Sequence, residues 1–115
     1  MAGPNQAPPA IIDGATVELW AWSWPEPFFR MPVVDPSTRI DPSKSIDENL
    51  RAATDSVAIH GLAIASYDSG GVYRFSCDAS WEPQNDSAWN SVEDARTAPS
   101  AQYDVALVTW QVVSP

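Results

Sequence analysis

Two side chains in this sequence, His60 and Cys77, are of types that can act as a general base or a nucleophile. The chain has one histidine and one cysteine, so no ligand pair has the two-residue or four-residue spacing of a zinc site. His60 falls at the end of a predicted helix, where an imidazole is better explained as a helix cap or a core-edge residue than as a base. Cys77 precedes Asp78, and a neighbouring carboxylate disfavours the reactive thiolate. We therefore expect no hydrolase chemistry.

The acidic pairs and the glycine pair also have structural explanations. Asp47-Glu48 and Glu93-Asp94 lie in the first turns of predicted helices, where carboxylates complement the helix dipole. Gly70-Gly71 precede a predicted strand, and the lysine of a phosphate-binding loop is missing. Residues 78–86 lack the alternating acids and turn glycine of a calcium loop. The sequence predicts no metal, no cofactor and no nucleotide site, and we expect a protein that is not an enzyme.

The elements that would position these residues follow from the apolar pattern. Residues 1–14 hold three prolines and two glycines ahead of any periodicity, and we expect a flexible lead outside the core. Thr16–Trp24 alternates until Pro25 and predicts a strand that is apolar on both faces. The prolines of residues 25–44 forbid a helix and predict an ordered loop with at most a short edge strand over residues 28–31.

A capping box at Ser45-Ile46-Asp47-Glu48 predicts that a helix begins at residue 46. Apolar steps of three and four residues extend it to His60, with Gly61 as its left-handed C-cap. Residues 62–67 and 72–79 flank two glycines and predict a β-hairpin in which Cys77 faces inward. We expect a loop over residues 81–89, a short helix capped by Ser91, and a last strand over residues 104–113.

The predicted element order is β-α-β-β-α-β, which is that of a ferredoxin-like split βαβ sandwich. We therefore predict an α+β fold with an antiparallel sheet and two helices on one face. A chain of 115 residues has the length of one domain. The predicted organisation is a flexible lead over residues 1–14 and a single domain over residues 15–115, with the Pro-rich loop at residues 25–44.

Three of the six tryptophans, Trp20, Trp22 and Trp24, recur at two-residue steps on the first predicted strand. They should share one face, with alternate residues such as Val17 and Leu19 on the other. Together they carry about 450–750 Å² of surface, as much as the largest apolar patch usual on a monomer. We therefore expect this row to be covered.

Three explanations for that cover remain open. The row is the helix-facing core, or it is covered by Phe28, Phe29 and Met31, or it is an interface with a second copy or a docked partner. An apolar row beside an acidic rim would suit a basic partner protein, because the rim steers association and the row holds the complex.

The charge balance limits the classes of partner. Fifteen acidic and six basic side chains give a net charge of −9, which repels nucleic-acid phosphates and anionic lipids. After Arg74 the only cation is Arg96, so the C-terminal part is either a solubilising surface or one that attracts a basic protein. The sequence has a single cysteine, which cannot form an internal disulfide. It shows no signal-peptide pattern and no apolar run of the roughly 18 residues that a membrane span needs. We expect a cytoplasmic protein with no membrane and no direct nucleic-acid contact.

The segments VYRFSCD at residues 72–78, WE at 81–82, ND at 85–86 and SVEDA at 91–95 resemble small bacterial proteins that serve as immunity partners in polymorphic-toxin loci. Such immunity proteins neutralise a cognate toxin by occluding its active site, often with acidic residues set against a basic groove. The resemblance implies that role for five acids, namely Asp78, Glu82, Asp86, Glu93 and Asp94.

We therefore predict a non-catalytic inhibitor of the immunity type that binds a basic or nucleic-acid-acting protein. A phage-type inhibitor of a defence enzyme would look the same in sequence. The alternative is a structural or assembly module that oligomerises through the Trp-rich strand, and a ligand pocket lined by tryptophans is a third reading. The predicted partner-binding residues are Asp78, Glu82, Asp86, Glu93, Asp94, Trp81, Trp89, Trp20, Trp22 and Trp24.

Overall fold

A computed structural model describes residues 6–34 and 40–113 of the chain as an α+β fold. The main antiparallel sheet is curled, and its strands lie in the order β1 (Ile11–Ile12), β2 (Ala15–Trp22), β5 (Gly61–Ser66), β6 (Val72–Cys77) and β7 (Pro83–Trp89). A short β8 (Gln111–Val112) pairs with β2. The remaining elements are the two-stranded sheet of β3 (Phe29–Val34) and β4 (Thr54–Ile59), the helices α1 (Ile46–Ala53) and α2 (Val92–Thr97), and the 3-10 helix η1 (Val105–Leu107).

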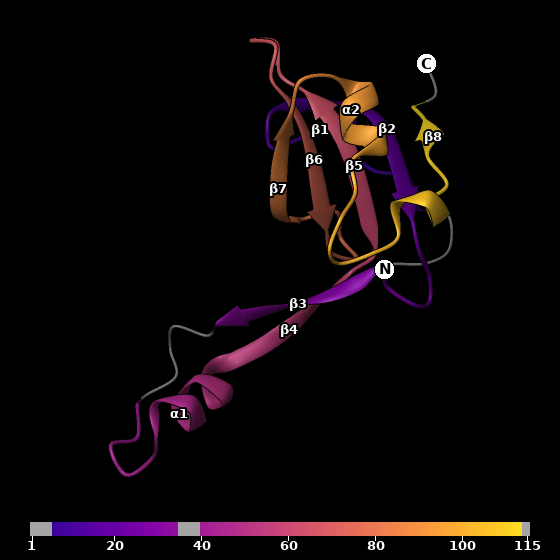
Figure 1. Cartoon of the computed structure of the whole chain (residues 1–115). Coiled ribbons are helices and arrows are strands. Elements are labelled where there is room, and N and C mark those ends of the chain that lie inside the picture. The colour runs from indigo at the N-terminus through magenta and orange to yellow at the C-terminus, as the bar shows by residue number, and fades with distance from the viewer. Residues whose placement is uncertain (1–5, 35–39, 114–115) are drawn as a thin grey trace.

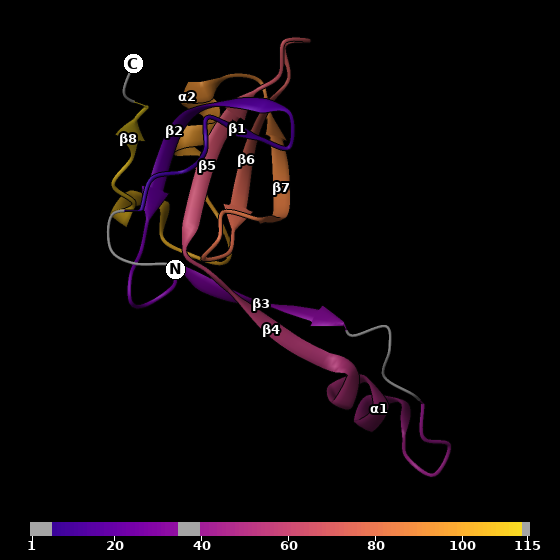
Figure 2. The ribbon, with the colours of Figure 1, turned by 180° about the vertical axis from the view of Figure 1, so that it is seen from behind.

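The ribbon of β3 and β4 projects from the main sheet and ends at α1 (Figures 1 and 2). We call residues 29–59 the arm and the rest of the chain the body. The radius of gyration is 16.3 Å, against about 13 Å for a compact domain of this length. The longest dimension, 57 Å, is nearly twice the next, 31 Å. The Pro-rich segment was predicted as an ordered loop with at most a short edge strand over residues 28–31; in the structure it supplies the longer strand β3 of this projecting ribbon.

The first helix begins where the capping box predicts but is shorter than expected. The Glu48 amide donates to the Ser45 hydroxyl at 3.1 Å, which confirms the cap. The predicted extension to His60 was wrong, because the chain leaves α1 at Ala53 and forms β4. Three of the six residues of β4 are β-branched, which favours a strand. Pairing with β3 gives the backbone N–H and C=O groups of this segment hydrogen-bond partners, whereas a short isolated helix is only marginally stable.

The C-terminal half contains one confirmed hairpin and two wrong predictions. β5 and β6 form the hairpin, and of its two turn glycines Gly70 has the positive φ, 103°. The segment predicted as a loop at residues 81–89 forms β7, with Pro83 at its first position, where a proline is tolerated. The strand predicted over residues 104–113 is reduced to β8, because the Asp104 carboxylate accepts from the Ala106 amide and starts η1.

The ferredoxin-like topology was wrong, although the α+β class and the antiparallel sheet are confirmed. That topology requires each helix to cross over between strands of one sheet, whereas α1 lies at the end of the arm (Figure 1). The lead predicted over residues 1–14 is also partly wrong. Ile11–Ile12 pairs with β2, and Ile12 is buried in the core; residues 1–5 lie outside the described part.

A register shift in β2 decides which residues share a face. The shift falls between Val17 and Leu19, so Val17 packs with Trp20 while Leu19 packs on the opposite face with Ile64 and Ala95. The predicted common face of Val17 and Leu19 was therefore wrong, because a bulge adds one residue and reverses the alternation.

Two of the three explanations for the tryptophan row were also wrong. Helix α2 packs through Ala95 on the face opposite Trp20, so the tryptophans are not the helix-facing core. Phe28, Phe29 and Met31 join a different cluster at the base of the arm. Trp20 lies opposite the small Ala63 of β5, and the ring of Trp81, from the turn before β7, covers Trp20 and contacts Trp22.

Candidate functional site

Four tryptophans and His60 form a continuous aromatic cluster at the end of β2. Trp81 contacts Trp20 edge-on at a centroid distance of 6.3 Å and Trp22 at 5.4 Å. Trp22 stacks on Trp24 at 6.3 Å, and Trp24 lies 4.8 Å from His60. Trp20 and Trp81 are buried, whereas Trp24 is 40% exposed. Of the predicted tryptophan interface, only the Trp24 end reaches the surface to this extent.

His60 lies in the body core and not at a helix end. Its Nδ1 is 2.8 Å from the Ser23 carbonyl oxygen, which accepts only, so Nδ1 carries the proton that it donates. The His60 amide donates to the Cys77 carbonyl at 3.1 Å, and its own carbonyl accepts from the Ser23 amide at 2.9 Å. These contacts fix His60 as a packing residue among Trp22 and Trp24. They match the expected core-edge histidine.

Trp81 occupies its place because the turn before β7 is held by Asp78. The Asp78 carboxylate accepts from the amides of Ser80 at 2.8 Å and Glu82 at 3.0 Å. Trp81 itself has a positive φ of 63°. Its ring lies so close to Gly61 that a Cβ on residue 61 would be 2.6 Å from it. Gly61 is therefore needed for this close packing at the start of β5, and it does not serve as the predicted helix C-cap. Asp78 and Trp81, both predicted to bind a partner, are engaged inside the body.

The thiol of Cys77 is fully buried beside this turn. Burial, with a smaller contribution from the nearby carboxylates of Asp78 and Glu82, raises the pKa of Cys77 to about 12. A thiol that stays protonated is a poor nucleophile. The sequence prediction that Cys77 faces inward is confirmed.

The other predicted acids are exposed but do not form one patch. Glu82 lies just before β7, and Asp86 lies in the middle of that strand. Glu93 and Asp94 lie in the first turn of α2, which follows β7 and packs against it. The Arg96 guanidinium donates to Glu93 at 2.9 Å and lowers the pKa of that carboxyl. Asp86 is paired with Phe75, which packs with Trp20 on the side of the sheet opposite α2, so Asp86 and Asp94 lie on opposite sides of the sheet beside the free edge of β7. We call β7 together with α2 the β7–α2 edge.

Arg74 is the residue that the sequence pattern missed. It is 7% exposed, and it donates to the carbonyl oxygens of Ala95 at 2.9 Å, Ala98 at 2.6 Å and Pro99 at 3.3 Å. These carbonyls belong to the C-terminal end of α2, the negative end of the helix dipole. The only signal was its position, as the one charged residue between apolar neighbours of the hairpin strand.

Two aromatic rings enclose the Arg74 guanidinium. The Trp89 ring centroid lies 5.3 Å from its Cζ, and that of Tyr103 lies 5.8 Å away. The Trp89 indole donates to the Ser87 hydroxyl at 2.8 Å. Burial raises the pKa of Tyr103. Trp89, predicted to contact a partner, is therefore half-buried and committed to holding α2 on the sheet.

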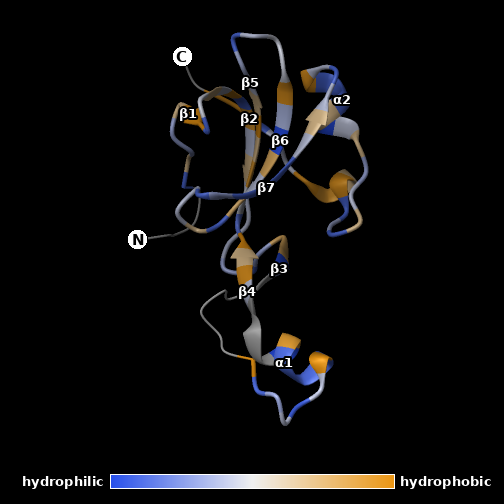
Figure 3. Ribbon diagram, turned by 90° about the vertical axis from the view of Figure 1, so that its left-hand side faces the viewer, coloured by the Kyte–Doolittle hydropathy of each residue, from blue (hydrophilic) through white to orange (hydrophobic). Residues whose placement is uncertain are grey.

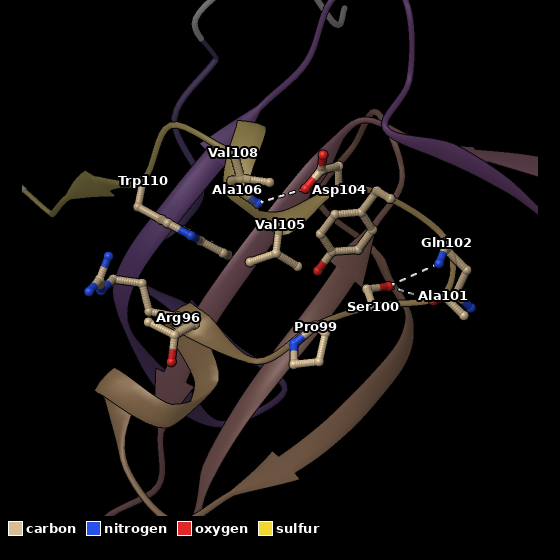
Figure 4. A pocket seen from close by; sticks show the side chains of 12 residues that line it. Arg96, Pro99, Ser100, Ala101, Gln102, Asp104, Val105, Ala106, Val108 and Trp110 are labelled. Atoms are coloured by element: carbon tan, nitrogen blue, oxygen red, sulfur yellow. Dashed lines mark hydrogen bonds between the residues drawn. The ribbon is translucent and has the colours of Figure 1, made fainter.

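An open depression of about 790 Å³ lies between α2, the segment at residues 99–104 and η1 (Figure 4). Arg96 and Trp110 lie on one side of it, and Ser100 and Gln102 lie on the other. Its lining offers no nucleophile beside a base, and Arg96 is already paired with Glu93. Throughout the described residues, no three His, Cys, Asp or Glu side chains gather as a metal site would require.

The arm has the strongest features of a contact surface. Ile40 and Ile46 are 80% and 86% exposed, and they lie at the far end of the ribbon, where apolar and hydrophilic positions alternate (Figure 3). Both outer edges of the β3–β4 ribbon lack a further strand within the described residues. Arg30, Lys44 and Arg51 are exposed, and no ion pair engages them in that part of the chain. Sequence reasoning missed this surface because it assigned the segment to a loop and one long helix.

No protein-family model, curated protein or solved structure was found that matches the chain. Among the described residues, the helices are too short and too polar to cross a membrane. The arm and the β7–α2 edge are therefore the two surfaces that stand out from the structure itself.

Proposed function

We propose that the protein is a non-catalytic protein-binding module that holds its partner with the arm. The observation that carries this proposal is the exposure of Ile40 and Ile46 on an element that projects away from the body core. A surface of this kind gains free energy when another protein covers it.

The arm is also too small to be well stabilised by its own contacts. A lone two-stranded ribbon is marginally stable in water, and a helix needs about 12–15 residues to form alone. The helix α1 has 8 residues. A partner that packs on the arm would supply the missing apolar contacts.

An immunity-type inhibitor is the first form of this function. The exposed acids Asp86, Glu93 and Asp94 support it, because they would steer the body onto a basic groove while the arm enters it. Replacing Glu82, Asp86, Glu93 and Asp94 with their amides should then slow association at low salt more than it speeds dissociation. If the amide variant associates as fast as the parent, the acids contribute to solubility and not to binding.

An assembly module is the second form, and the unpaired edges of the ribbon favour it. Such edges can add a strand from a neighbouring chain. The module would use the arm and not the Trp-rich strand expected from the sequence, because Trp20 is buried.

A pair of matched variants tests the use of the arm. Ile46→Arg places a charge on the arm, and Leu107→Arg places the same charge on the body at a residue of nearly equal exposure, 80% against 86%. Each tagged variant is used to capture proteins from the native host, and each protein that the parent binds is then purified and its affinity measured. We expect Ile46→Arg to weaken binding at least about tenfold, as expected when a buried interface residue is replaced by a charge. Equal affinity for both variants would overturn the proposal.

A further inference from the structure

We infer that a second copy of this chain is a partner of the arm, with the arm of each copy lying along the β7–α2 edge of the other. The inference rests on the proposed function, because it names the occupant of the same contact surface. In a two-fold pair both contacts are identical, so each copy gives one arm and receives one.

The distribution of charge favours this occupant. The arm, residues 29–59, holds four of the six basic residues and five of the fifteen acids, which gives a net charge of −1. The body holds the other two basic residues and ten acids, which gives −8. In the body Arg74 is buried on carbonyl groups and Arg96 is paired with Glu93. Among the described residues, Arg30, Lys44 and Arg51 are thus the exposed basic groups that an acidic body surface can meet.

The amount of exposed surface is of the right size for such a pair. The chain exposes 7343 Å², about 1,200 Å² more than the roughly 6,200 Å² typical of a compact monomer of this mass. A standard stable interface buries about 1,200–2,000 Å² over both partners. If each of the two copies covers half of its excess, the pair buries about 1,200 Å² in total, which lies within this range.

The body offers an edge for the arm to follow. β7 is the last strand of the main sheet and pairs only with β6 among the described strands. Asp86 projects from the middle of β7, and Asp94 lies on the adjacent helix. A strand of the arm laid beside β7 would pair the free edges of both sheets. Because the side chains of a strand alternate between its two sides, arm cations would then approach Asp86 on one side of the sheet and Asp94 on the other.

A charge-swap experiment tests the inference. The arm variant carries Arg30→Glu and Arg51→Glu, and the body variant carries Asp86→Lys and Asp94→Lys; all four residues are exposed. Light scattering at low salt should show a dimer for the parent and a dimer dissociation constant at least about tenfold weaker for each variant alone. An equal mixture of the two variants should recover the dimer, because each arm then meets a body of opposite charge.

The control separates specific contacts from net charge. Glu26→Lys with Asp68→Lys makes the same change as the body variant, from −9 to −5, at exposed sites away from the β7–α2 edge. If net repulsion alone governed association, the body variant and the control variant would both dimerise more strongly than the parent. We expect stronger dimerisation of the control variant only. A body variant that dimerises as well as the control variant overturns the inference.

The outcome can also distinguish the two proposals. A parent that stays monomeric at all concentrations overturns the second-copy inference, while arm-dependent capture of a different protein would leave the proposed function standing. Circular dichroism of every variant confirms that the fold is kept.

Discussion

Arg74 provides the sharpest test of how the body is held together. Its guanidinium bonds three carbonyls at the end of α2 and lies between Trp89 and Tyr103. Arg74→Met keeps most of the side-chain volume and removes every one of these donors. We expect α2 and the segment after it to loosen from the sheet.

The magnitude follows from the burial of the acceptors. Ala95 and Ala98 are 0% and 7% exposed, so water cannot easily replace the lost donor at their carbonyls, whereas Pro99 is exposed and can be rehydrated. Each bond from a charged donor contributes about 1.5–3 kcal/mol. Two such bonds give about 3–6 kcal/mol, and partial relaxation of the helix end brings the expected loss to about 3–4 kcal/mol. For a chain of this length that lowers the melting temperature by roughly 12–17 °C.

Urea unfolding followed by tryptophan fluorescence measures this loss directly. The matched control is Arg96→Met, whose pair with Glu93 joins side chains that are 41% and 67% exposed and should contribute less than about 1 kcal/mol. Arg74→Lys should fall between the two, since one ammonium group cannot reach three carbonyls in the same geometry. A loss for Arg74→Met no larger than that for Arg96→Met would refute the role assigned to Arg74.

Three further predictions concern the aromatic cluster, the helix caps and the thiol. Gly61→Ala should destabilise the body by about 1–3 kcal/mol through overpacking against Trp81, seen as a lower urea midpoint; an unchanged midpoint would mean that the ring moves freely. Ser91→Ala should lower the global free energy of unfolding by about 1 kcal/mol. Ser45→Ala should instead reduce the helical circular dichroism signal of the arm and leave the urea midpoint of the body unchanged. If both variants shift that midpoint equally, the arm and the body unfold together. Cys77 should resist a thiol reagent at pH 8 and react once urea unfolds the body, because its folded pKa of about 12 lies above its ordinary value of 9.0 and the protonated form persists in the native state; rapid labelling without urea would contradict this.

The surfaces proposed to bind a partner differ from the residues that sequence reasoning selected. The acids Glu82, Asp86, Glu93 and Asp94 are exposed as predicted, because carboxylates in a first helical turn or on an open strand keep their hydration. Trp81 and Trp89 were selected for their type, yet both are used within the body. Residue type alone does not tell whether an aromatic ring finds its cover within the chain or on a partner.

Local patterns in the sequence determined those features that depend on neighbouring residues. The caps at Ser45 and Ser91, the hairpin turn at Gly70 and the inward-facing Cys77 all follow from contacts within a few positions or from strict alternation. Each of these features needs only local backbone geometry, so the sequence by itself was sufficient to predict it.

The tertiary structure decided what depends on distant partners. Residues 54–59 became a strand because β3 was there to pair with them, and the bulge between Val17 and Leu19 moved Val17 to the tryptophan face. Arg74 was buried because the end of α2 presented carbonyls to it. In each case the free energy comes from groups far apart in the chain, and helix propensity or strand alternation is too weak to resist it. The arm is the largest result of such pairing, since its strands come from segments about 20 residues apart that local pattern alone assigned to a loop and a helix.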